Sequence, residues 1–228
     1  MHYRIDGENL PVLKITLEQN EGIDCEAGAM SWMDDEIEMQ TSTGGGIGKM
    51  FGRMLTNEKA FMNRYIARRP GEIAFSSKFP GSIRAVRITP DNGLIIQKGS
   101  FLACAGNISN EVYIQKRLSG GFFGGEGFLM RHYHGDGMVF LEIDGSAHEY
   151  DIPAGDCKII DTGYLAAMSD TCRLEVRTVK GVGNIFFGGE GLFNTVVYGP
   201  GHIILQSMPI SSTAMMLYQY MPHPSNNG

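Results

Sequence analysis

The chain has 228 residues, of which 43% are hydrophobic and 19% are charged, a balance that supplies a core and excludes a disordered chain. Its 31 glycines follow no Gly-X-Y period, which excludes collagen and favours a β fold with many turns. The formal net charge is -6, and no run of basic residues extends beyond Arg68 and Arg69. General electrostatic binding of nucleic acid or anionic lipid is therefore not expected.

The N-terminal residues contain no basic segment followed by an apolar one, so no signal peptide is predicted. No apolar run approaches the ~20 residues that a membrane helix needs. The cysteines show no CxxC spacing, and we expect them to be reduced and packed as small apolar residues. They are Cys25, Cys104, Cys157 and Cys172. These features predict a soluble, cytoplasmic protein.

Apolar and polar residues alternate strictly in three segments, residues 36–41, 112–118 and 172–179. Such alternation predicts strands with one buried and one solvated face. The expected buried residues are Ile37 and Met39, then Val112, Ile114 and Leu118, then Cys172, Leu174 and Val176.

Two segments depart from this strand pattern. Residues 47–55 carry an apolar stripe with helical spacing, which predicts one short helix. Its stripe either packs on the sheet or forms a methionine-rich surface for a partner. The apolar residues 213–221 form either a last strand or a docking segment, and a polar tail follows them.

A glycine-rich octapeptide occurs twice, as "FFGGEGFL" at 122–129 and "FFGGEGLF" at 186–193, 64 positions later. A second pair of similar segments begins at Gly81 and at Gly145, again 64 positions apart. A period of this size indicates internal repeats. We predict a single domain over residues 1–212, built of three β pseudo-repeats at about 10–75, 79–141 and 143–207, with residues 213–228 as a C-terminal segment and tail.

The expected class is therefore all-β, with each unit a small β-sandwich or short double-stranded β-helix. Glycines of the octapeptide permit positive φ angles and close strand approach, so the repeat serves architecture rather than a ligand. The alignment also matches Glu58, Glu126 and Glu190. These carboxylates either bond to turn amides and nearby arginines or form a ring that faces a pore or a cation.

His132 and His134 are two positions apart, so on a strand they share a face and could bind one metal. Metal-binding cupins follow such a pair with a glutamate and with a third histidine after a Pro-x-Gly turn. This chain offers Glu142 and the turn 153–156, but the third position is Lys158, whose ammonium has no lone pair to give. We expect ordinary hydrogen bonds at the two histidines and predict no metal and no cofactor.

No catalytic constellation is evident in the sequence. The octapeptide lacks the Gly-Lys-Ser/Thr ending of a phosphate loop, and no GxSxG elbow is present. None of the six histidines pairs with a nucleophile and an acid. We predict no catalytic and no cofactor-binding residue, and a protein that is not an enzyme.

Residues 44–67, 99–109 and 186–207 together resemble the altered-inheritance-of-mitochondria protein twenty-four family, over about residues 3–212. Asn57 departs from the glycine expected before the glutamate there. The resemblance implies tandem β units similar to the tryptophan-RNA-binding attenuator fold, ring-like oligomers that are trimers in bacteria, and a link to mitochondrial inner-membrane organisation in fungal relatives. It implies no catalytic residue and no cofactor.

We therefore expect an uncharacterised, non-enzymatic oligomeric scaffold or binding protein, a homotrimer that assembles through strand edges. Its further partner would be an unidentified protein or a membrane surface. One alternative is a degenerate cupin-like protein that binds a small molecule or a metal. The other is an RNA-binding ring, although the acidic chain without a basic stripe predicts no nucleic-acid partner.

Overall fold

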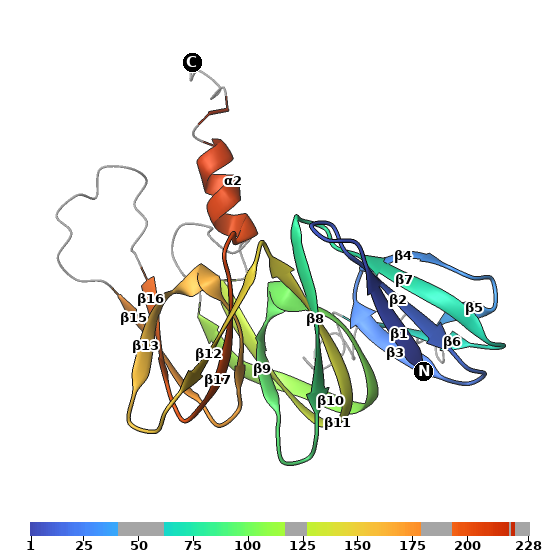
Figure 1. Ribbon diagram of the computed structural model, residues 1–228, viewed down its shortest axis with the longest axis horizontal. Helices are drawn as coiled ribbons and strands as arrows, with labels where there is room; N and C mark the ends of the chain where they lie inside the picture. Colours follow the sequence, from blue (N-terminus) through green and yellow to red (C-terminus); the bar gives the residue numbers. More distant parts are fainter. Residues whose placement is uncertain (41–61, 117–126, 179–192, 219, 222–228) are drawn as a thin grey trace, which may run out of the picture.

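The computed structural model describes residues 1–40, 62–116, 127–178, 193–218 and 220–221 (Figure 1). In these ranges the chain folds into antiparallel sheets, with one short α-helix near the C-terminus. The all-β class predicted from the sequence is thereby confirmed. Several sequence predictions fall outside the described residues. They are the helix at 47–55, both octapeptides except residues 127–129 and 193, and the aligned Glu58, Glu126 and Glu190. The three-repeat organisation therefore stays a prediction.

The N-terminal sheet has four strands in the order β1-β2-β7-β4. These strands are β1 (His2–Asp6), β2 (Val12–Leu17), β7 (Gly71–Ser76) and β4 (Met30–Met33). Strand β2 shows why the sheet forms here, because Leu13, Ile15 and Leu17 alternate with polar or half-buried residues and are fully buried. Its inner face thus contributes to a buried hydrophobic cluster.

A ten-stranded sheet runs through the middle of the molecule, in the order β12-β17-β14-β9-β11-β10-β3-β6-β5, with β8 also paired to β11. Its strands are β3 (Gly22–Glu26), β5 (Ile37–Gln40), β6 (Met62–Ala67), β8 (Gly81–Ile88), β9 (Leu94–Gln97), β10 (Phe101–Lys116), β11 (Phe128–Asp144), β12 (Ala147–Ile152), β14 (Leu165–Ser169) and β17 (Gly201–Gln206).

The long strands β10 and β11 form the central ladder, which pairs Phe101 with Leu141 at one end and Lys116 with Phe128 at the other. On its second side β11 pairs with β9 through one half and with β8 through the other. Glycines lie where the halves meet. A Cβ on Gly135, which has a φ of 123°, would lie 2.1 Å from the carbonyl oxygen of Asn107, so this close approach of the two strands requires glycine.

A third sheet has the order β13-β16-β15 and lies at the opposite end of the long axis from the N-terminal sheet (Figure 1). Its strands are β13 (Cys157–Asp161), β16 (Phe193–Tyr198) and β15 (Arg173–Thr178). The 3₁₀ turn η1 (Lys98–Ser100) connects β9 to β10, and the 3₁₀ turn η2 (Thr162–Tyr164) connects β13 to β14. The two strand pairs therefore have the same type of connection.

The three alternating segments all contain strands, but their faces are buried to different degrees. In 172–179 the prediction is confirmed for Cys172 and Leu174, which are buried opposite the exposed Arg173 and Arg177. In the other two segments Met39 and Val112 are exposed, contrary to expectation. Alternation defines the two faces of a strand, but only neighbouring elements decide whether a face is covered.

The C-terminal segment is α2 (Ile210–Tyr218), so the strand predicted as one alternative for residues 213–221 is wrong. The helix begins directly after Pro209, and the amide of Thr213 donates to the Pro209 carbonyl at 3.1 Å. The carboxylate of Asp144 accepts the Ile210 N–H at 2.8 Å and so satisfies one amide that the helix itself leaves unpaired. This cap comes from the end of β11, which local sequence could not reveal.

All four cysteines are free, as expected, and Cys25, Cys104 and Cys172 are buried whereas Cys157 is exposed. Burial raises the pKa of the Cys25 thiol to about 12, so it stays protonated and packs as an apolar group. Within the described ranges, no helix combines the length and the apolar character that crossing a membrane requires.

Candidate functional site

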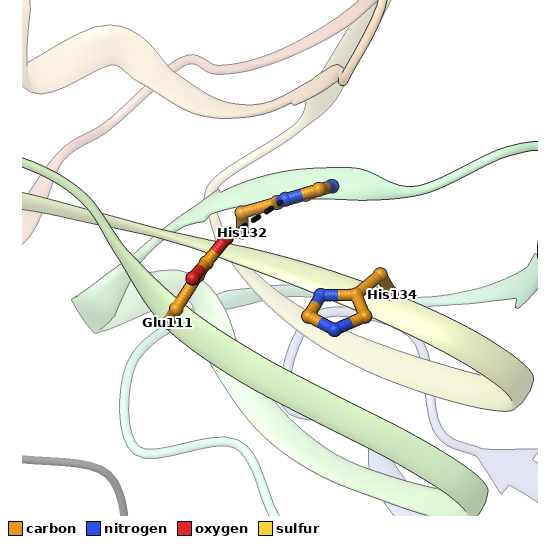
Figure 2. A group of neighbouring side chains, drawn as sticks. All are labelled: Glu111, His132 and His134. Atoms are coloured by element: carbon orange, nitrogen blue, oxygen red, sulfur yellow. Dashed lines mark ion pairs between the residues drawn. The ribbon is translucent and has the colours of Figure 1, made fainter.

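Glu111, His132 and His134 come together on the central ladder. The register of β10 and β11 places Glu111 directly opposite His132, and Ser109 opposite His134. Because side chains alternate along a strand, the two histidines share one face, and a residue directly across the ladder shares it too. Figure 2 shows the three side chains gathered on this face, with the Glu111 carboxylate directed at His132.

One ligand atom from each of these residues lies within 4.8 Å of the other two. The Nδ1 atom of His132 is 3.8 Å from Oε1 of Glu111. The rings of His132 and His134 are 5.2 Å apart between centroids and tilted by 42°. His132 is half-buried, whereas Glu111 and His134 are exposed, so the cluster is open to solvent on one side.

Asp170 holds the inner edge of the His132 ring. Its Oδ2 atom is 3.2 Å from His132 Nε2 and accepts the Gly93 N–H at 3.0 Å. The Asp170 amide in turn donates to the Gly93 carbonyl at 3.3 Å. The carboxylate is therefore fixed by the backbone at the start of β9, and it orients the imidazole so that Nδ1 faces Glu111.

Gly93 leaves the space in which this pair sits. A Cβ at this position would lie 2.4 Å from Asp170 Oδ2 and 2.6 Å from His132 Nε2. Any larger residue would therefore displace the imidazole or the carboxylate, unless the loop before β9 moved. No sequence pattern connected this turn glycine with the histidines.

The cupin-like constellation considered from the sequence is not assembled. Glu142 is buried elsewhere on β11 and accepts hydrogen bonds from the Ser77 hydroxyl and the Lys78 amide. Lys158 lies over the ring of Tyr150 at 4.1 Å. The carboxylates near His132 are instead Glu111 and Asp170, neither of which sequence analysis singled out. Only the strand register could have identified Glu111.

His202 forms a different histidine cluster, on β17. Its Nδ1 atom is 2.8 Å from Asp151 Oδ1 and its Nε2 atom is 3.1 Å from Glu149 Oε2, both on β12. Each ring nitrogen thus faces its own carboxylate. His132 also has a carboxylate at each ring nitrogen, but no second histidine joins His202 in a three-donor group within the described residues.

The helix α2 is a second candidate region, because none of its residues is buried. It extends away from the sheets at the edge of the molecule (Figure 1). Ile210, Met216 and Leu217 are each more than half exposed. Residues 208–221 include no acidic or basic side chain. The helix therefore presents an uncharged, largely apolar surface to its surroundings.

Comparison with known proteins gives a consistent family and fold. The family model for mitochondrial biogenesis AIM24 matches residues 3–208, which confirms the resemblance found in the sequence. A crystal structure of a protein from Streptococcus pyogenes is similar with a TM-score of 0.79 and 24% identity, over 96% of this chain and 99% of that one. At this identity the likeness supports the fold alone. No curated protein matches the chain significantly.

Proposed function

The chain belongs to the mitochondrial biogenesis AIM24 family, and we propose that it is a non-enzymatic β scaffold that assembles with further copies of itself. The observation that carries this proposal is the exposed apolar helix α2. The expected assembly is a homotrimer.

The helix α2 has nine residues and none of them is buried. Helices shorter than ~12–15 residues are marginal in water by themselves, and most of their stability in proteins comes from packing one face. Burial of Ile210, Met216 and Leu217 against a partner would supply that packing. Each buried side chain of this size stabilises by roughly 1.5–3 kcal/mol, so three of them suffice to hold the helix.

A second copy of the chain is the occupant that fits the surface best. Each terminal sheet has two outer strands, β1 and β4 in one sheet and β13 and β15 in the other. Within the described residues, each of these strands pairs with a neighbouring strand on one side only. Ile159 on β13 is exposed as well. Open strand edges favour pairing with another chain, and identical copies that join unlike edges form a ring when the rotation between successive copies closes. A net charge of -6 disfavours the anionic membrane surface as an alternative.

The test is the molar mass of the untagged full-length chain, measured by size-exclusion chromatography with light scattering over a range of concentrations. We expect a mass near three chains for the wild type. The double variant Met216→Asp, Leu217→Asp should shift toward the monomer, because it places two charges on the apolar face of α2. Leu10→Asp is the matched control, since Leu10 is exposed in the loop between β1 and β2.

A wild-type chain that stays monomeric at tens of micromolar would refute self-association. Co-sedimentation with phosphatidylcholine vesicles that the double variant abolishes, without a change in mass, would instead assign α2 to a membrane surface.

A further inference from the structure

The side chains of Glu111, His132 and His134 form the one grouping of three metal-type donors within the described residues. Zinc binds imidazole nitrogen and carboxylate oxygen at about 2.0–2.2 Å, so two ligands of a tetrahedral ion lie roughly 3.3–3.6 Å apart. The donors here already lie within 4.8 Å of one another. The remaining approach of at most about 1.2–1.5 Å is within reach of exposed side chains, and Glu111 is 64% exposed.

The donor His132 is oriented as a metal ligand before any ion binds. Metal-binding histidines almost always donate their second ring N–H to a carboxylate or carbonyl, which fixes the tautomer and strengthens the ligand. Here His132 Nε2 faces Asp170 at 3.2 Å, and the Gly93 N–H holds that carboxylate in place at 3.0 Å. With its proton on Nε2, the ring turns the Nδ1 lone pair toward Glu111.

We propose that Glu111, His132 and His134 bind one divalent first-row transition cation of the zinc class on the β10–β11 ladder, with Asp170 as the positioning residue. Two imidazoles and one carboxylate suit zinc and its neighbours, whereas magnesium and calcium take oxygen ligands. Three protein ligands leave an open coordination position, and the solvent-exposed side of the cluster provides the space for it. The site lies within one chain, so it does not depend on self-association.

His202 provides an internal control of the same chemistry. Like His132, it has one carboxylate beside each ring nitrogen, at 2.8 Å and 3.1 Å. No second histidine joins it in a three-donor group within the described residues. The proposal therefore predicts that zinc distinguishes two histidine–carboxylate clusters of one protein.

The experiment is isothermal titration of the untagged, EDTA-treated full-length chain with zinc chloride, followed by visible spectroscopy of the cobalt(II) form. We expect one zinc per chain. His134→Ala and Glu111→Gln should each weaken zinc binding at least tenfold, and both residues are exposed, so these variants should fold. Asp170→Asn should weaken it about 10–100-fold and shift the cobalt(II) absorption bands. Asp170→Glu should recover part of the affinity.

The matched control is His202→Ala, which should leave both the stoichiometry and the cobalt(II) spectrum unchanged. Absence of a one-to-one zinc complex in the wild type at millimolar metal would overturn the proposal. Zinc binding that persists unchanged in the double variant Glu111→Gln, His134→Ala, or that disappears in His202→Ala, would overturn it as well.

Discussion

The histidine cluster on the central ladder and the helix α2 differ in how many contacts each makes with the rest of the chain. At the cluster, His132 is held by Asp170, and Asp170 by the backbone of Gly93, so strands β9, β10 and β11 and the end of β14 all contribute. The helix is attached at its N-terminus through Asp144 and buries none of its residues. The polar cluster is thus held by contacts within one chain, whereas the apolar helix leaves its side chains exposed.

The sharpest test of this difference removes one methionine side chain from each region. Met130 on β11 is fully buried, and Met216 on α2 is about half exposed. Met130→Ala should lower the free energy of unfolding by about 2–5 kcal/mol, because it leaves a cavity. Met216→Ala should change it by less than about 0.5 kcal/mol, as exposed substitutions do.

Urea denaturation, at dilutions where the chain is monomeric, measures both changes. A loss at Met216→Ala comparable to that at Met130→Ala would show that α2 is already stabilised within one chain, which would remove the contrast between the two regions.

A smaller effect is expected from Gly93→Ala, which tests how tightly the polar cluster is built. The added methyl group would lie 2.4 Å from Asp170 Oδ2 and 2.6 Å from His132 Nε2. Overpacking of this kind lowers the free energy of unfolding by about 1–3 kcal/mol, and it should also weaken zinc binding. Gly99→Ala is the control, because a Cβ at Gly99 meets nothing within 4 Å. Equal melting temperatures of the two variants would mean that the cluster adapts freely.

The smallest expected effect concerns the cap of α2. Burial raises the pKa of the Asp144 carboxyl, although its hydrogen bond from Ile210 lowers it in part. The folded state therefore holds this proton more tightly than the unfolded chain. Stability is lost as the pH rises from the ordinary value of 3.8 through the raised folded value, and the loss persists above it.

Asp144→Asn keeps an acceptor for the Ile210 amide and removes the half-buried charge. It should be more stable than the wild type at pH 7 and equal to it well below pH 3.8, and thermal melts at both pH values would show this. Asp35→Asn, at an exposed turn, should show no such difference. A variant less stable than the wild type at pH 7 would mean that the charged cap contributes more than its burial costs.

Sequence patterns predicted the strands well, but they predicted less well which strand faces are buried by neighbouring elements. The same alternation rule succeeded at Leu174 and failed at Val112, because a pattern of faces does not say which face another sheet will cover. The residues of α2 are apolar enough for a strand and include strong helix formers such as alanine, methionine and leucine. The remote carboxylate of Asp144 supplies a cap that favours the helix.

At the candidate site, too, the sequence predicted the position of residues along a strand but not their neighbours across the sheet. The spacing of His132 and His134 was sufficient to place both on one strand face, and the comparison with metal-binding cupins offered Glu142 as the acidic residue beside them. The structure places Glu142 on the Ser77 hydroxyl and the Lys78 amide, and it brings Glu111 to His132 instead. Spacing along one strand carries no information about the residue opposite, which depends on the register between two strands.

By itself the sequence determined the all-β class, the buried strand face at Cys172 and Leu174 and the family, because alternation, glycine-rich turns and motif combinations are written locally. Only the tertiary structure decided which carboxylates meet His132 and how α2 begins. Asp170 lies 38 positions from His132, and Asp144 lies 66 positions from Ile210. Contacts over such separations form only when the sheets align, since hydrogen-bond register and side-chain packing act between elements rather than along them.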